Sequence, residues 1–459
     1  MSQTRFMIAA PASGSGKTLI TCGLMHLLKR KGYQVQSFKC GPDFIDPMFH
    51  AYITGRPSGN LDAFMAEPEV VRNLLAAGMK DADCTVVEAV MGFFDGIGFG
   101  DPRASSSDVA AGTGTPVILV MNGRGVSTSI LPQIQGMLSY PGGEMIRGII
   151  LNRVSKGVYP AMKQMIENVL PVKVTGYLPE LPDVHLDSRH LGLMMPSEID
   201  DLGHQLDVLA DVMDETICLE DLAALAETAE SLEEEQENRR TCSQRKGTLR
   251  IAAAKDEAFC FFYQENLRML EENGAELVWF SPVHDRMLPE DIDAILLVGG
   301  YPELKACELS KNTAMRQAIS DAHRSGIPIL AECGGFLYLH ESLEDPEGTA
   351  WPMCGIIHAD AYHNHRLTRF GYITLQNGTF FGEDIGPVRA HEFHHYDSTD
   401  PGSSFLAVKP SGKRHWNCIH STENMYAGFP HLYYPANPGI VHAFLAAAEK
   451  YRYRSTTPF

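Results

Sequence analysis

The chain has 459 residues, a formal net charge of −19 and a hydrophobic content of 44%. This length exceeds what one ordinary core supports and predicts two or three domains of roughly 100–200 residues each. The acidic balance argues against a nucleic-acid partner, because phosphates would be repelled. No apolar run approaches the ~18 residues that a membrane span needs and the N-terminus lacks a signal-peptide pattern, so no membrane association is expected.

Ten cysteines are scattered along the chain, at positions 22, 40, 84, 218, 242, 260, 307, 333, 354 and 418. None forms a C-x-x-C pair, which disfavours a zinc ribbon or a disulfide framework. The scattered, unpaired cysteines predict that the protein works in the reducing cytoplasm.

The first part of the chain alternates short apolar strands with helical stretches. Strands are predicted at residues 5–10, 85–87, 117–120 and 149–151. A helix is expected after the first strand, where Ile20, Leu24 and Leu27 recur at helical spacing. This alternation predicts a doubly wound α/β domain over residues 1–200.

A change in composition separates this part from the rest. Residues 201–247 are predicted to form a helical segment and a solvated linker, because a stretch rich in Leu, Ala and Glu runs into the charged residues 233–240. Strand patterns resume at residues 250–254, 294–298 and 327–330. A second α/β domain is therefore predicted over residues 248–459.

A glycine-serine loop follows the first predicted strand. It consists of Ser13, Gly14, Ser15, Gly16, Lys17 and Thr18. Pro11 occupies the position where the usual G-x-x-x-x-G-K-[ST] pattern begins with glycine. The glycines let backbone N–H groups turn toward phosphate oxygens, the helix N-terminus favours an anion, and Lys17 reaches the terminal phosphates. The alternative, a glycine-rich turn without a ligand, is disfavoured by the preceding strand, the following helix and the GKT ending, so these residues are predicted to bind a nucleotide.

Carboxylates stand at the ends of two predicted strands. Asp43 and Asp46 follow one strand, and Glu88 follows the strand at 85–87. Because the carboxyl ends of parallel strands share one crevice with the loop, Thr18, Asp43 and Glu88 are predicted to hold Mg²⁺. Asp46 is assigned to the substrate. For each acid alone, a solvent-facing loop position is the alternative.

Two more polar residues follow strands of the same domain. Asp95 lies a few residues past Glu88 and is predicted to be catalytic, facing a substrate carboxylate or its phosphorylated form. Asn152 follows the strand at 149–151, and its amide is predicted to contact adenine.

The segment Ala331–Gly335 has the pattern of a nucleophile elbow. A strand ends at Cys333, and small residues follow so that backbone can approach closely. Cys333 is therefore the predicted nucleophile, and the N–H groups of Gly334 and Gly300 are the predicted oxyanion donors. A buried core cysteine is the alternative, and it is the interpretation adopted for the other nine.

A catalytic thiol needs a base, and the second half of the chain offers many histidines. His431 lies in a short strand-like run and is the preferred candidate, whereas His442 leads into an Ala-rich helix and is expected to be structural. The cluster at residues 391–395 resembles metal spacing but has no matching second cluster. It is expected to line a pocket or edge near the thiol.

Together these motifs resemble the cobyrinic acid a,c-diamide synthase family, glutamine-dependent enzymes of cobalamin synthesis. The resemblance covers nearly the whole chain and rests on residues 11–18, 39–46, 60–62, 88–96, 151–154, 189–193, 299–303, 331–335 and 391–394. The GPD and MGxxDG motifs are more specific than the phosphate loop itself.

The resemblance implies a nucleotide-binding domain of the dethiobiotin synthetase type followed by a triad-type glutaminase. It makes Cys333 the nucleophile and His431 the histidine that activates it. Many triad glutaminases carry an acid two residues after this histidine, and here that position is Tyr433. Ala89 and Pro11 are two smaller departures from the family pattern.

The activity implied is amidation of the a and c side-chain carboxylates of cobyrinic acid, driven by ATP with Mg²⁺ and using glutamine as the nitrogen source. The same chemistry on hydrogenobyrinic acid or nickel sirohydrochlorin is the alternative, and cobyric acid synthase is a more distant one. A nucleotide switch of the partitioning-ATPase kind is disfavoured, because such switches carry an extra lysine where this chain has Ala12 or Ser13.

Overall fold

The computed structural model describes residues 4–184, 188–189, 192–193, 195–232 and 248–456. The chain divides into two compact units, Met1–Glu237 and Asn238–Phe459. Two parts of the sequence interpretation lie outside the described residues: the linker at 233–247, and residues 190–191 of one quoted motif.

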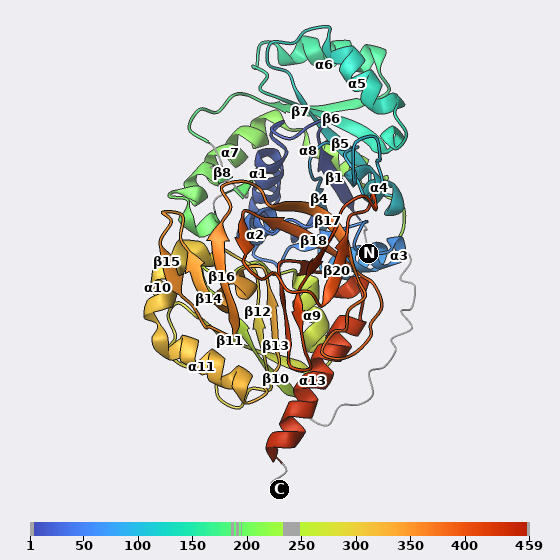
Figure 1. Ribbon diagram of the computed structural model, residues 1–459. Helices are drawn as coiled ribbons and strands as arrows, with labels where there is room; N and C mark the ends of the chain where they lie inside the picture. The colour runs from blue at the N-terminus through green and yellow to red at the C-terminus, as the bar shows by residue number, and fades with distance from the viewer. Residues whose placement is uncertain (1–3, 185–187, 190–191, 194, 233–247, 457–459) are drawn as a thin grey trace. The chain divides into compact units, whose positions relative to one another are not determined.

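The first unit contains a parallel sheet of seven strands in the order β3-β2-β4-β1-β5-β6-β7 (Figure 1). The strands are β1 (Arg5–Ala9), β2 (Val35–Cys40), β3 (Gly59–Leu61), β4 (Cys84–Glu88), β5 (Val117–Asn122), β6 (Ile146–Asn152) and β7 (Lys173–Leu178). Strands β1, β2 and β4 are buried at every residue, as expected for strands covered on both faces. The first half of the chain thus forms the strand–helix alternation that its sequence predicts.

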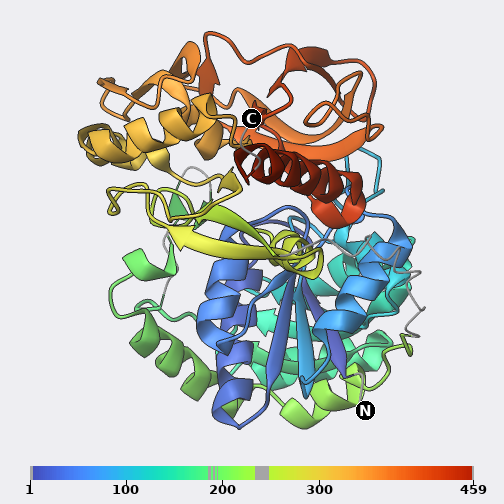
Figure 2. The same cartoon turned by 90° about the horizontal axis from the view of Figure 1, so that it is seen from below.

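Helices cover both faces of this sheet, as the view from below shows (Figure 2). They are α1 (Lys17–Arg30), α2 (Ile45–Thr54), α3 (Pro68–Gly78), α4 (Ser106–Gly112), α5 (Ile130–Ser139), α6 (Tyr159–Val169), α7 (Leu202–Thr216) and α8 (Leu219–Ala226). Short elements complete the unit: β8 (Ser188–Arg189), β9 (Gly192–Leu193), and the 3₁₀ helices η1 (Gly143–Met145) and η2 (Pro196–Glu198).

Helices α7 and α8 pack within the first unit, although the sequence interpretation grouped them with the linker. Helix α7 contacts α1 and β7, and α8 contacts β7 and β6. The cause is an apolar face of α7 that includes the buried residues Leu206, Leu209 and Met213. Arg30 of α1 also pairs with Asp211 of α7 at 2.7 Å.

The second unit is built on a six-stranded sheet in the order β11-β10-β12-β13-β23-β22, parallel apart from the β22–β23 pair. Two further sheets have the orders β15-β14-β16-β19 and β21-β20-β17-β18-β24. The strands are β10 (Leu249–Ala254), β11 (Ala275–Phe280), β12 (Ala294–Leu297), β13 (Ile329–Glu332), β14 (His340–Glu344), β15 (Ala350–Pro352), β16 (Ile357–His363), β17 (Arg369–Gln376), β18 (Val388–His394), β19 (Tyr396–Ser398), β20 (Phe405–Val408), β21 (His415–Cys418), β22 (His420–Ser421), β23 (Met425–Gly428) and β24 (His431–Leu432).

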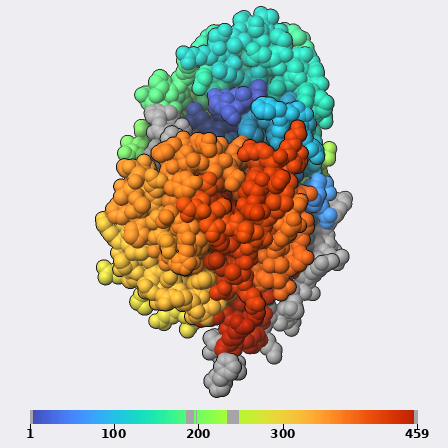
Figure 3. Space-filling model, in the orientation of Figure 1, coloured from blue at the N-terminus to red at the C-terminus, as the bar shows by residue number. Residues whose placement is uncertain are grey.

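The helices of the second unit are α9 (Gln264–Glu272), α10 (Ala306–Lys311), α11 (Thr313–Arg324), α12 (Gly334–Tyr338) and α13 (Gly439–Thr456), with 3₁₀ helices η3 (Pro302–Lys305) and η4 (Tyr434–Ala436). In the space-filling view the face of this unit turned to the viewer is formed mainly by the orange and red part of the chain, which contains β14 to β24 (Figure 3). The strand-rich C-terminal part therefore supplies most of this face of the unit. Within the described ranges, no helix combines the length and the apolar character needed to cross a membrane.

Candidate active sites

The predicted phosphate loop connects β1 to α1 at the carboxyl end of the first sheet. Ser13 and Gly14 are exposed, and the Ser15 hydroxyl donates to the backbone oxygen of Ala12 at 2.8 Å. Lys17 is 7% exposed, and its Nζ donates to the backbone oxygen of Met91 at 2.6 Å. Burial and the charge of Lys39 lower the pKa of Lys17. The loop is therefore preformed, with its lysine bound to backbone that lies beside it.

Gly16 ends the loop in the left-handed conformation, with φ 93°. Asn152, at the end of β6, donates from Nδ2 to the backbone oxygen of Ser15 at 2.8 Å and accepts from the Arg153 N–H at 2.9 Å. Both ends of the Asn152 amide are therefore engaged, Nδ2 with the loop and Oδ1 with the backbone that follows β6. Its contact with adenine stays a prediction.

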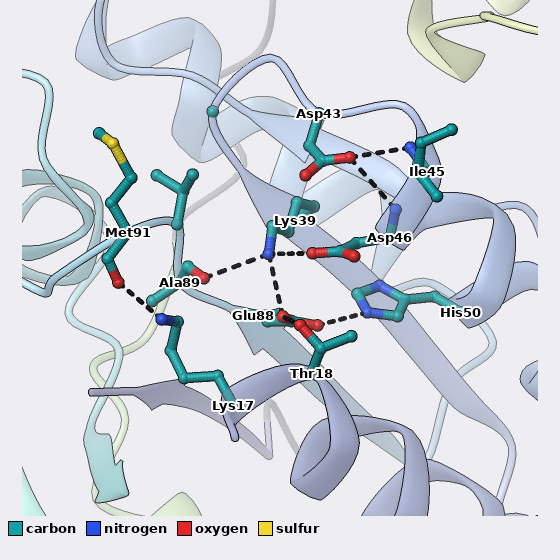
Figure 4. Close-up of polar contacts among 12 residues, drawn as sticks. Lys17, Thr18, Lys39, Asp43, Ile45, Asp46, His50, Glu88, Ala89 and Met91 are labelled. Atoms are coloured by element: carbon teal, nitrogen blue, oxygen red, sulfur yellow. Dashed lines mark hydrogen bonds and ion pairs between the residues drawn. The ribbon is translucent and has the colours of Figure 1, made fainter. Parts of the chain in front are cut away.

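Beside the loop, a network joins the buried residues Glu88, Lys39, Asp46 and His50 with the half-buried Thr18 (Figure 4). The Thr18 hydroxyl donates to Glu88 Oε1 at 2.6 Å, and Lys39 Nζ donates to the same oxygen at 2.9 Å. Lys39 also pairs with Asp46, while His50 Nε2 lies 2.7 Å from Glu88 Oε2. Glu88 therefore holds three neighbours on its two carboxylate oxygens.

The charges of this network follow from burial and pairing. Burial opposes a charge on Lys39, but the carboxylates of Asp46 and Glu88 outweigh it and raise the lysine pKa. Burial also opposes a charge on Glu88, yet Lys39 and the His50 hydrogen bond hold its pKa well below the usual range. Burial raises the pKa of Asp46 to about 8, with Lys39 opposing the rise. The network is thus an ionised Lys39–Glu88 pair with a second acid that accepts protons readily.

Two predicted acids of this unit make local backbone contacts. Asp43 Oδ1 accepts the N–H groups of Ile45 and Asp46 at 2.8 and 3.2 Å, which holds the start of α2. Asp95 is exposed, and its Oδ2 accepts the N–H of Gly92 at 2.8 Å. Asp46 is 8% exposed and paired with Lys39, so its predicted contact with substrate, like that of Asp95, stays a prediction.

The fit of Mg²⁺ to Thr18, Asp43 and Glu88 can be tested against these contacts. Because Thr18 donates its proton to Glu88, the lone pairs of its oxygen stay available to a cation. Among the described residues, however, no group of three or more His, Cys, Asp or Glu side chains could hold a metal ion. The three residues fit Mg²⁺ only with phosphate and water oxygens completing its coordination, which is usual for this ion.

Sequence interpretation assigned no role to Lys39 or His50. Lys39 lies in β2, two residues before the GPD motif, and a lysine that is only 3% exposed requires a charged partner. His50 stands four residues after Asp46 on α2, on the same helix face. That spacing is the signal in the sequence from which His50 could have been found.

In the second unit, Cys333 occupies the turn between β13 and α12. Its φ of 48° and ψ of −103° are strained for a residue with a side chain, as at a nucleophile elbow. Its N–H donates to the backbone oxygen of Gly428 at 2.8 Å, which fixes the turn to β23. The Cys333 residue is 7% exposed. Burial and then the charge of Glu303 raise the pKa of Cys333, while the N–H of Gly334 bonds the sulfur and lowers it.

The predicted oxyanion donors lie next to each other. Gly300 N is 3.0 Å from the point where a Cβ on Gly334 would stand. This places the backbone nitrogen of Gly300 beside the turn that bears the sulfur. The role of the Gly300 and Gly334 N–H groups as oxyanion donors stays a prediction.

His431 lies on β24, and its ring lies against Gly299, the residue before Gly300. Its Cε1 would stand 2.6 Å from a Cβ at Gly299, so only glycine leaves room for the ring. Burial lowers the pKa of His431 to about 4, which keeps the imidazole neutral at neutral pH. A neutral imidazole is the form that accepts a proton from a thiol.

The histidine cluster of β18 adjoins this site. His391 is the sheet partner of His431, and His394 stacks on Phe429 with ring centroids 3.9 Å apart. The cluster therefore lies beside His431, and its predicted place near the thiol stays a prediction. His442 lies in α13, and it is a helix residue as predicted.

Comparison with known proteins divides the chain in the same way. Residues 6–193 match the family described as CobQ/CobB/MinD/ParA nucleotide binding domain, and residues 250–438 match the CobB/CobQ-like glutamine amidotransferase domain. The cobyrinate a,c-diamide synthase of Listeria innocua is 38% identical over 97% of this chain and 100% of its own. Enzymes of the same name are 36% identical in Salmonella typhimurium, over 97% and 98%, and 39% identical in Fusobacterium nucleatum, over 94% and 97%.

This chain belongs to the cobyrinate a,c-diamide synthase family. The family resemblance and the fold class expected from the sequence, a P-loop α/β domain followed by a glutaminase α/β domain, are both confirmed. As a member of this family the chain is a glutamine-dependent amidoligase of cobalamin synthesis.

Proposed function

We propose that this cobyrinate a,c-diamide synthase family member uses ATP and glutamine to amidate the a and c side-chain carboxylates of cobyrinic acid. The proposal is supported above all by the combination in one chain of a strained thiol turn at Cys333 and a phosphate loop at Lys17. A thiol beside backbone N–H donors suits amide hydrolysis, and a phosphate loop beside buried carboxylates suits phosphoryl transfer.

In the glutaminase unit, Cys333 Sγ attacks the side-chain amide carbon of glutamine. His431 takes the thiol proton and delivers it to the leaving nitrogen, so that ammonia departs and a thioester remains. The N–H groups of Gly334 and Gly300 hold the oxyanion formed during attack. Water then cleaves the thioester, which releases glutamate and restores the thiol.

In the nucleotide unit, a carboxylate oxygen of the substrate attacks the γ-phosphorus of ATP, and ADP leaves. Lys17 holds the terminal phosphates, and Asp95 faces the acyl phosphate from its exposed turn. Ammonia attacks the acyl carbon, phosphate leaves, and a proton is released as the amide forms. When bound with ATP through Thr18, Asp43 and Glu88, Mg²⁺ offsets negative charge on the phosphates.

The division of labour is tested with Cys333→Ser. This variant should lose glutamine-dependent amidation while keeping amidation driven by ammonium salts, because the nucleotide unit needs only free ammonia. Loss of both activities in a folded variant contradicts the proposal.

The substrate is tested separately. Cobyrinic acid, hydrogenobyrinic acid and nickel sirohydrochlorin are each supplied with ATP and ammonium salts, and the product masses give the number of amides formed. The proposal expects two amides on cobyrinic acid and the highest kcat/KM for that compound. A higher kcat/KM for either alternative assigns the chain to that tetrapyrrole.

A further inference from the structure

The position two residues after His431 provides no acid. Tyr433 is fully buried and packs edge-on against Tyr263, with ring centroids 5.3 Å apart. It is a core residue of the second unit. A carboxylate that orients the imidazole must therefore come from another element.

Glu332 supplies such a carboxylate from the strand that carries the nucleophile. Its Oε2 lies 3.9 Å from His431 Nδ1, and the two side chains are 7% and 3% exposed. The same oxygen accepts the N–H of Leu432 at 3.3 Å, and Oε1 accepts the hydroxyl of Tyr434 at 3.4 Å. The Glu332 carboxyl group thus lies beside the His431 imidazole. It also accepts hydrogen bonds from Leu432 and Tyr434, which follow His431 in the chain.

We infer that Glu332 is the positioning residue of the glutaminase site, holding His431 by its Nδ1 side and leaving Nε2 for the thiol proton. When Cys333 transfers that proton to Nε2, the imidazolium carries a positive charge and the Glu332 carboxylate balances it. Glu332 therefore acts through His431, as the acid of a Ser-His-Asp triad does, and touches neither glutamine nor the thioester.

Burial supports this pairing in energetic terms. It raises the pKa of Glu332 to about 8, so the carboxyl resists charge in the resting site. An imidazolium beside it favours the charged form, because an opposite charge within ~4–6 Å lowers a carboxyl pKa. Glu332 acts as the ionised carboxylate, formed before the thiol proton moves, so that activation transfers one proton only, from Cys333 Sγ to His431 Nε2.

A second buried acid in the same unit provides a matched control. Glu392 on β18 is 1% exposed, and burial raises its pKa to about 7. The cross-strand partner of Glu392 is Gly371, whereas His391, the residue before it, pairs with His431. Because side chains alternate along a strand, Glu392 lies on the opposite face from His431. Glu392→Gln therefore makes the same chemical change at a similarly buried site without touching the imidazole.

The test compares Glu332→Gln, Glu332→Asp and Glu392→Gln in the full chain. We expect Glu332→Gln to lower kcat for glutamine hydrolysis on the order of 10–100-fold while KM for glutamine stays within about threefold, as for loss of a group acting on the proton-transfer step. Glu332→Asp should recover part of the loss, because it restores the charge at a slightly longer distance. Amidation driven by ammonium salts should stay unchanged in all three variants.

Three results would overturn the inference: an unchanged kcat in Glu332→Gln, an equal loss in Glu392→Gln, or a Glu332→Asp no more active than Glu332→Gln. Should Glu332→Gln not fold, Glu332→Asp decides alone, with an unchanged kcat counting against the inference. The inference rests on the proposed roles of Cys333 and His431, and the failures are distinguishable. Glutamine hydrolysis by Cys333→Ser refutes the proposed function, whereas an inactive Cys333→Ser beside a fully active Glu332→Gln refutes only the role of Glu332.

Discussion

The side chain of Asn152 donates a 2.8 Å hydrogen bond to the backbone oxygen of Ser15, joining the end of β6 to the phosphate loop. The bond passes directly beside Gly16, where a Cβ would stand 2.3 Å from Asn152 Nδ2. Strand and loop are therefore spaced so closely that position 16 has no room for a side chain.

Replacing Gly16 with alanine should displace Asn152 and distort the loop. Gly16→Ala adds this clash to the strain of a φ of 93°, and together they should lower nucleotide affinity at least 10-fold. Gly14→Ala is the control, since its φ is 76° but its Cβ would meet nothing within 4 Å. Calorimetric titration with ATP should rank wild type, Gly14→Ala and Gly16→Ala in that order, and equal effects of the two substitutions would contradict this account.

Removing the Lys39 ammonium should destabilise the first unit strongly. Lys39→Met leaves Glu88 and Asp46 buried without their cation, and breaking a buried pair in this way costs about 3–5 kcal/mol. Lys31→Met removes the exposed pair with Asp214 and should cost less than about 1 kcal/mol. Urea unfolding followed by hydrogen exchange in β2 and β4 measures both values. Similar losses of unfolding free energy in the two variants would show that the buried ion pair stabilises the unit no more than the exposed pair does.

A methyl group at Gly299 should impair the glutaminase alone. Gly299→Ala places its Cβ 2.6 Å from His431 Cε1, so the imidazole must shift from its present position. Glutamine-dependent amidation should fall about 100-fold, since misplacement by ~1 Å can cost that much, and ammonium-driven amidation should persist. Steady-state rates with each nitrogen source measure the difference, and an unaffected glutamine rate would place the catalytic base elsewhere.

Acid should destabilise the second unit. Burial lowers the pKa of four histidines there to about 3 or 4 from 6.5; they are His340, His391, His394 and His431. Below about pH 6.5 the unfolded state therefore binds four protons that the native state does not bind. The free energy of unfolding decreases as the pH is lowered. Glu332 and Glu392 act in the opposite sense, because burial raises their pKa values to about 8 and about 7. The native state therefore holds two protons on these carboxyl groups that the unfolded state binds only when the pH falls to about 4.5.

The excess of two protons on the unfolded state sets the sign: stability should decrease between about pH 6.5 and pH 4.5. All three tryptophans of the chain, Trp279, Trp351 and Trp416, lie in the second unit. Their fluorescence therefore follows this unit during urea unfolding. The midpoint should be lower at pH 5 than at pH 7, and an equal or higher midpoint at pH 5 would be contrary to the expected sign.

Contiguous motifs were the part of both sites that could be predicted. The loop around Lys17 and the turn at Cys333 are each formed by residues adjacent in sequence. Their glycines permit the backbone conformation that each turn requires. Asp43 shows where this reasoning reaches its limit. The sequence predicts that Asp43 lies near the loop. In the structure its carboxylate oxygen accepts hydrogen bonds from backbone N–H groups at the start of α2, a local contact that the motif does not predict.

The sequence by itself determined the two α/β units, the phosphate loop and the thiol turn, because each follows from short-range periodicity and turn chemistry. Only the tertiary structure decided that Glu88 lies between Lys39 and His50, and that Glu332 lies beside His431. The physical reason is that these contacts join segments distant in the chain. Strand order and register in the folded sheets set which of the many buried acids meets which base, and neither is encoded in a local spacing.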